Sequence, residues 1–298
     1  MRLPASLAGI LSAMLTDHAG DRGLVHLAAA AKRYAWRDPW VLKDLDLTVA
    51  PGRLVEVRGA NGSGKSTLLR MLAGATLPTR GRRVAAAGLA VGYGPERLIP
   101  APPFAAGTYL AHHARLRRLP EGVGGAHAAA LAERLGVASL LGEPLRTLSK
   151  GSLQKVVIIQ ALLGEPALVI LDEPFAGLDA EASVALCDVV SEVTAAGSTV
   201  LFSDHRERDV RPRADLVWRV SDGGVHEEPV RSVAVLARLS GVISTREQDG
   251  RVELIVAARA SDAVLSSLIG SGWHVTGVAA DATPGRMRID AVARVGAS

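Results

Sequence analysis

Runs of apolar residues divide the central part of the chain into short strands and longer helices. Residues 42–49 are predicted to form a half-buried strand, because apolar and polar positions alternate from Leu45 to Val49. Continuous apolar runs at 89–93, 168–171 and 199–203 are typical of strands that are buried on both faces. Helical patterns lie around and between these runs, most clearly at 67–73, 104–119, 127–135 and 180–195. Strands that alternate with helices predict an α/β core around a largely parallel sheet.

The same patterns separate three regions. Residues 1–23 form a leader whose apolar stretch is interrupted by Pro4. We interpret this leader as an added amphipathic segment, or as a start codon placed too early, rather than as a signal peptide. Residues 24–225 carry every chemical motif, and within them residues 97–160 are predicted to form a mostly helical lobe.

Residues 230–298 follow a different pattern. Alternating segments at 242–245 and 251–258 flank Asp249-Gly250, a dipeptide that favours a tight hairpin turn. A short helix and two further strands are predicted after them, at 261–270, 273–278 and 287–292. This β-β-α-β-β order predicts a small accessory α+β module.

Composition and charge narrow the class of protein. Apolar residues make up 48% of the chain and aromatic residues only 3%, so small aliphatic side chains must supply most of the core. The net charge of +4 is spread along the chain without a basic run that contains aromatics, so we expect no nucleic-acid partner. No apolar run reaches the ~18 residues needed to span a bilayer. The single cysteine, Cys187, excludes an intramolecular disulfide.

A glycine-rich loop gives the strongest chemical signal. It lies between a predicted strand at 54–58 and the helix that follows, and it matches the Walker A pattern. Its backbone N–H groups and the helix N-terminus would surround phosphate, while Lys65 would neutralise the β- and γ-phosphates and the Ser66 hydroxyl could ligate Mg²⁺. The predicted phosphate-binding residues are Gly59, Ala60, Asn61, Gly62, Ser63, Gly64, Lys65, Ser66 and Thr67.

Two further motifs follow along the chain. The apolar run that ends at Leu171 is followed by Asp172 and Glu173. We expect Asp172 to hold Mg²⁺ and Glu173 to act as general base for the attacking water. Between the Walker A loop and this pair lies Leu148-Ser149-Lys150-Gly151-Ser152, followed by a helical pattern. Taken alone, this segment is a helix start with Ser149 or Ser152 as the N-cap, and its N-terminus could bind an anion.

The order of these motifs resembles that of the ATP-binding cassette (ABC) ATPases, over about residues 24–225. The resemblance implies a P-loop NTPase core of ABC type with a helical lobe, and ATP and Mg²⁺ as ligands. It also implies that Ser149 and Gly151 contact the γ-phosphate of ATP held by a second subunit. Lys150 and Ser152 depart from the family's Leu-Ser-Gly-Gly-Gln signature, so we expect altered contacts across that dimer.

Other family elements match single positions of this chain. Tyr34 stands where the family has the aromatic side chain that stacks on adenine, with Trp36 as the alternative. Glu96 stands where a glutamine usually links Mg²⁺ to the helical lobe, so it is a candidate metal ligand. The segment 177–179 resembles the loop that touches the partner subunit, and His205 matches the histidine near the γ-phosphate.

The resemblance implies an ATP-hydrolysing subunit on the cytoplasmic face of a membrane. It would act with a second ATPase subunit, identical or different, and with a separate transmembrane permease that docks near residues 97–120. The sequence of residues 108–117 resembles the helical lobe of ABC ATPases that drive exporters. The alternatives are an ABC ATPase outside transport and a nucleotide-dependent regulator that does not hydrolyse ATP. The transported substrate is not written in this chain.

Overall fold

The computed structural model describes residues 23–98, 103–204, 214–228, 236, 239–248, 251–270 and 273–293. The chain divides into two compact units, one formed by residues 1–212 with 218–226 and the other by residues 213–217 with 227–298. The predicted leader, apart from Gly23, lies outside the described residues. Within the described ranges, no helix is long and apolar enough to cross a membrane.

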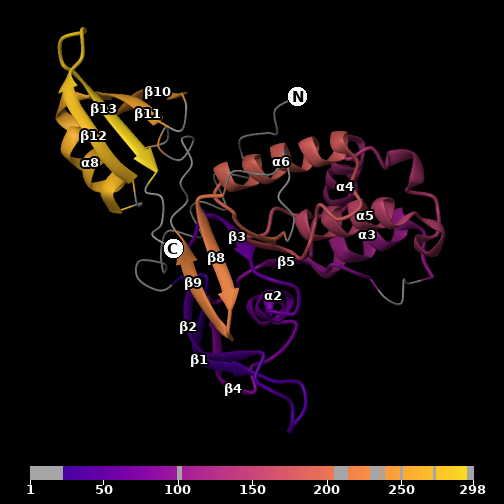
Figure 1. Cartoon of the computed structure of the whole chain (residues 1–298). Helices are drawn as coiled ribbons and strands as arrows, with labels where there is room; N and C mark the ends of the chain where they lie inside the picture. Colours follow the sequence, from indigo (N-terminus) through magenta and orange to yellow (C-terminus); the bar gives the residue numbers. More distant parts are fainter. Residues whose placement is uncertain are drawn as a thin grey trace. The chain divides into compact units, whose positions relative to one another are not determined.

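A six-stranded sheet with the strand order β5-β6-β7-β3-β8-β9 forms the centre of the larger unit (Figure 1). The pairs β5/β6, β6/β7 and β3/β7 are parallel, so the carboxyl ends of these strands meet at one edge of the sheet. All residues of β6 and β7 are buried, as their apolar runs predict. The strands are β3 (Leu54–Arg58), β5 (Val91–Gly94), β6 (Leu168–Leu171), β7 (Thr199–Ser203), β8 (Leu216–Ser221) and β9 (Gly224–Glu228).

A separate antiparallel sheet in the order β2-β1-β4 is built from strands in the N-terminal part of the described chain. Its strands are β1 (Val25–Lys32), β2 (Leu42–Val49) and β4 (Arg80–Ala85). The alternation predicted for residues 45–49 is confirmed, because Leu45, Leu47 and Val49 are buried while the residues between them are exposed. The hydrophobic pattern did not predict β1, whose centre is a run of alanines, or β4, which is rich in arginine.

Three helices of the larger unit, α3, α4 and α5, lie side by side (Figure 1). The helix α2 follows β3 after a short loop and contacts strands of the sheet. The helix α4 begins four residues before its predicted start, in spite of two consecutive glycines. The helices are α2 (Lys65–Ala73), α3 (Ala106–Leu116), α4 (Val123–Arg134), α5 (Lys150–Leu162) and α6 (Ala180–Ala195), with 3-10 turns at η1 (Ala138–Leu140) and η2 (Leu145–Thr147).

Two glycines let α5 pack directly on β5. A Cβ atom built on Gly92 would lie 1.8 Å from the carbonyl oxygen of Ala161, and one on Gly94 would also meet the Ala161 side chain. Successive side chains of a strand point to opposite faces, so Tyr93 between them faces the α2 side. The strand β5, which ends shortly before the candidate metal ligand Glu96, is therefore in backbone contact with α5.

The smaller unit is a four-stranded antiparallel sheet in the order β10-β11-β13-β12, with α8 packed on one face (Figure 1). Its core includes Leu254, Leu268, Trp273 and Ile289, all buried. The predicted turn residues 249–250 lie outside the described residues, but Gln248 pairs with Arg251 as a tight hairpin requires. The elements are β10 (Val242–Gln248), β11 (Arg251–Ala257), η3 (Ala258–Ala260), α8 (Ser261–Gly270), β12 (Trp273–Ala280) and β13 (Arg286–Ala293).

Candidate nucleotide site

The loop between β3 and α2 has a backbone that suits glycine at three positions. Gly59, Gly62 and Gly64 have φ values of 153°, 78° and 107°, which other residues rarely adopt. A Cβ atom on Gly59 would also lie 2.5 Å from the carbonyl oxygen of Val220. No side chain caps the start of α2, so the N–H groups of its first turn are left to bind an anion.

Lys65 is the first residue of α2 and is 7% exposed. Its Nζ donates hydrogen bonds to the carbonyl oxygens of Gly59, at 2.8 Å, and Ala60, at 3.1 Å. These contacts satisfy the buried ammonium and hold it over the loop. A full positive charge is therefore placed where the loop and the helix N-terminus already favour an anion.

Asp172 joins the loop to the end of β6. Its Oδ1 accepts hydrogen bonds from Ser66 Oγ at 3.1 Å and from Ser203 Oγ at 2.8 Å. The Ser203 hydroxyl in turn accepts the backbone N–H of Glu173 at 2.8 Å. Sequence reasoning missed Ser203 as a site residue, although it ends an apolar strand, because its role depends on β7 lying beside β6.

Glu173 follows Asp172 with a left-handed backbone, at a φ of 52°. This conformation costs a non-glycine residue of the order of 1–3 kcal/mol, and such strain concentrates at functional sites. The side chain is 9% exposed and lies at the carboxyl edge of the parallel strands. The turn thus presents two consecutive carboxylates at the edge of the sheet next to the phosphate loop.

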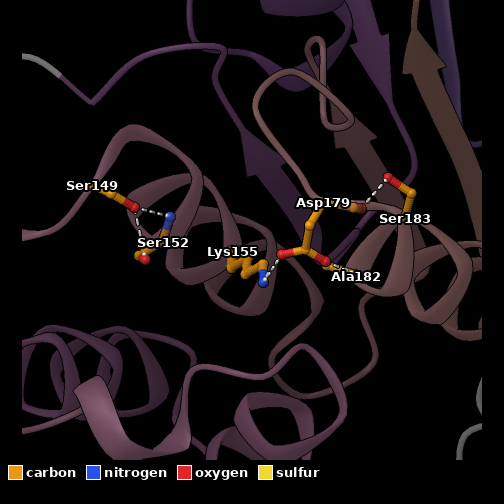
Figure 2. A network of polar contacts seen from close by, with 6 residues as sticks. All are labelled: Ser149, Ser152, Lys155, Asp179, Ala182 and Ser183. Atoms are coloured by element: carbon orange, nitrogen blue, oxygen red, sulfur yellow. Dashed lines mark hydrogen bonds and ion pairs between the residues drawn. The ribbon is translucent and has the colours of Figure 1, made fainter.

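The start of α5 is capped by Ser149, which decides between the two predicted caps. The Ser149 Oγ accepts the N–H of Ser152 at 3.1 Å and lies 2.9 Å from the Ser152 hydroxyl, as Figure 2 shows. A Cβ atom on Gly151 would lie 2.4 Å from the carbonyl oxygen of Gly177, so only glycine fits there. Ser149 and Lys150 are exposed, which leaves the start of this helix open to a ligand or a partner.

Tyr34 reaches the phosphate loop from the segment between β1 and β2. Its hydroxyl lies 3.0 Å from Thr67 Oγ1, and the residue is 56% exposed. Trp36 is 81% exposed, and the guanidinium of Arg33 stacks over its ring at 4.7 Å. Of the two aromatic candidates, the structure brings Tyr34 into contact with the loop.

Comparison with known proteins identifies the family. The model of the ABC transporter family matches residues 42–176, which include the phosphate loop, the start of α5 and Asp172. The zinc import ATP-binding protein ZnuC of Cereibacter sphaeroides is 39% identical over 178 residues, 59% of this chain and 71% of that protein. The chain belongs to the ABC transporter family, as an ATP-binding ATPase subunit.

A second ZnuC protein and a solved structure are also similar to this chain. ZnuC of Paracoccus denitrificans is 42% identical over 168 residues, and the match spans 63% of its length and 55% of this chain. A solved ATP-binding subunit of an ABC transporter is 28% identical, with a TM-score of 0.63 over 72% of this chain and 92% of that one. The two ZnuC proteins are named for zinc import, so the exporter preference drawn from residues 108–117 receives no support.

The remaining family positions differ in what the structure says of them. Glu96 lies just past β5, whose Gly94 accepts the N–H of Asp172 at 2.8 Å. Its carboxylate is partly exposed and pairs with Arg97 at 3.3 Å, while the hydrogen bonds of Ser66 and Ser203 go to Asp172. His205 lies outside the described residues, so its predicted place near the γ-phosphate stays a prediction.

The oxygen atoms at the loop suit a magnesium ion. Asp172 is 1% exposed, and its Oδ2 is buried without a hydrogen-bond partner among the described residues. The Ser66 hydroxyl lies beside the same carboxylate. No group of three or more His, Cys, Asp or Glu residues in the described ranges forms a metal cage. Magnesium is typically held by one or two protein oxygens together with phosphates and water, which fits this pair.

Proposed function

We propose that this subunit binds MgATP at the loop 59–67 and hydrolyses it to drive transport through a separate membrane permease. The observation that carries the proposal is the hydrogen bond of 3.1 Å between Ser66 and Asp172. It joins the phosphate loop to the end of β6, and Glu173 follows Asp172 directly in the chain, which supports a role for Glu173 at the same site. The family match over residues 42–176 supports ATP as the ligand.

The side chains divide the hydrolytic work by their chemistry. Lys65 and the N–H groups at the start of α2 neutralise the β- and γ-phosphates, and Ser66 and Asp172 hold Mg²⁺. When bound, Mg²⁺ supplies positive charge to the phosphate oxygens that become more negative during transfer. Glu173 orients the attacking water and accepts its proton. Tyr34 stacks on adenine beside the loop.

A second ATPase subunit completes the site. The open start of α5, with Ser149 and Gly151, contacts the γ-phosphate of ATP that the partner holds. In this chain the exposure of Ser149 and Lys150 supports that role, because their side chains are available to another molecule. A solved bacterial ABC transporter cassette of the same fold is dimeric, with a TM-score of 0.60 at 22% identity.

The permease binds the helical lobe, and it selects the substrate. The similar ZnuC proteins are named for zinc import, and one solved structure of the same fold is that of a "putative metal-chelate type ABC transporter". A metal ion or a metal chelate is therefore the first class of cargo to test. The subunit itself would stay at the cytoplasmic face of the membrane through its partner.

The membrane association can be tested by sedimentation. The tagged chain expressed alone in a foreign host should stay in the supernatant, and in its native host it should pellet with membranes. Extraction with detergent and pull-down should recover a polytopic membrane protein, identified by mass spectrometry. Recovery of ribosomes or DNA in its place would contradict the transport function and favour an ABC ATPase outside transport.

A further inference from the structure

The segment 177–179, just before α6, is fixed to α5 at two points. The backbone of Gly151 packs against the carbonyl group of Gly177, and Lys155 contacts Asp179 (Figure 2). Gly151 and Lys155 are four residues apart, so they lie on the same face of the helix, one turn from each other. That face of α5 therefore holds the segment along its length.

Lys155 makes the second attachment with an ion pair. Its side chain is only 10% exposed, and its Nζ lies 2.9 Å from Asp179 Oδ2. A buried ammonium needs a partner, and Asp179 is its hydrogen-bond partner within the described part of the chain. The backbone N–H of Ala182 and the Lys155 ammonium both lower the pKa of the Asp179 carboxyl, so it stays charged at neutral pH.

Asp179 also determines where α6 begins. Its Oδ1 caps the helix by accepting the N–H of Ala182 at 2.7 Å, and its carbonyl oxygen accepts the Ser183 hydroxyl at 2.8 Å. One carboxylate thus connects the buried face of α5 to the first turn of α6. Both helices begin near this carboxylate, and the start of α5 carries Ser149.

We infer that Lys155 is a positioning residue that makes the segment 177–179 and the start of α5 a single rigid surface for the second subunit. The inference rests on the proposed function, in which Ser149 meets ATP held by that subunit. Lys155 touches neither ATP nor the reacting atoms. It acts through Asp179, by fixing the segment beside the helix whose first residues make the contact.

A double-mutant cycle tests this role in the full-length chain. The parent carries Glu173→Gln to keep ATP intact, and Lys155→Met and Asp179→Asn are added singly and together. Asparagine keeps the cap on α6 but removes the charge. We expect Lys155→Met to raise the dimer dissociation constant roughly tenfold. Because Lys155 and Asp179 contact each other, their effects should not add, and the double variant should dimerise as well as Lys155→Met alone. Analytical ultracentrifugation with MgATP gives the dimer dissociation constant.

The chain offers a matched control in a second ion pair. Arg134 and Glu192 join α4 to α6 at 2.6 Å, and their side chains are 39% and 62% exposed. Arg134→Met should leave dimerisation unchanged, because exposed pairs contribute little. Equilibrium dialysis should show that ATP binding to the monomer is the same in the parent and in both single variants at positions 155 and 134.

The other outcomes contradict either the positioning role of Lys155 or the proposed function on which it rests. Unchanged dimerisation in Lys155→Met, or effects of the two changes that simply add, would overturn the positioning role alone. Monomer ATP binding that falls in parallel with dimerisation would show a general structural role, which also overturns it. A parent that binds ATP without dimerising would overturn the paired-subunit part of the proposed function, and the inference would fall with it.

Discussion

At the scale of single residues, Lys65 supplies the positive charge of the phosphate loop, and Ser203 joins the ends of β6 and β7. Lys65 could be assigned from the sequence because the Walker A spacing fixes its place at the start of a helix, and the structure holds its ammonium over the loop. Ser203 could not, because a serine at the end of a strand gains its meaning only from the strand beside it. The strain at Glu173 is likewise invisible in the sequence, since glutamate normally avoids a positive φ.

Lys65→Ala removes the one side-chain cation of the phosphate loop. Turnover should fall by at least about 10²–10³-fold, the cost of losing one strong stabilising group at developing charge. ATP binding should also weaken, because the loop amides alone would face the phosphates. Steady-state phosphate release and equilibrium dialysis measure the two effects. The melting temperature of the variant serves as the control for folding, and turnover near that of the unchanged chain would refute the assigned loop.

At the scale of elements, strands with continuous or alternating apolar residues were predicted, and strands rich in alanine or arginine were not. The strands β6 and β7 and the alternation in β2 followed from their patterns. The strand β1 escaped because alanines carry little strand preference, and β4 because its arginines resemble a loop. The close approach of α5 to β5 was also hidden, since a glycine in a strand does not say which neighbour requires it.

Gly92→Ala tests that close approach. Its Cβ atom would meet the carbonyl oxygen of Ala161 at 1.8 Å, so β5 and α5 must separate. We expect a loss of roughly 1–3 kcal/mol in the free energy of unfolding, as for other overpacked sites. Gly125→Ala is the matched control, because it lies in α4 with open space around it and should gain up to about 1 kcal/mol. Chemical denaturation compares both, and equal stability of the two variants would contradict the packing.

At the scale of the whole molecule, the motifs indicated the family and the accessory strands indicated the second unit. The β-β-α-β-β order of the smaller unit followed from its alternating segments, while the turn predicted at Asp249-Gly250 lies outside the described residues. The direction of transport could not be predicted, because the sequence of a helical lobe does not encode which substrate a separate permease moves, or in which direction. The chain's own chemistry is concentrated in the larger unit, where the phosphate loop meets the ends of β6 and β7.

The rate of ATP hydrolysis by Glu173→Gln tests the central claim most directly. Glutamine keeps the size of the side chain, and the bond from residue 173 to Ser203 uses the backbone N–H, so the local structure should persist. The account predicts a loss of at least about 10²-fold in turnover, because the general base is gone. ATP binding should remain, since Lys65, Ser66 and Asp172 are unchanged. Turnover equal to that of the unchanged chain would contradict the catalytic role of Glu173.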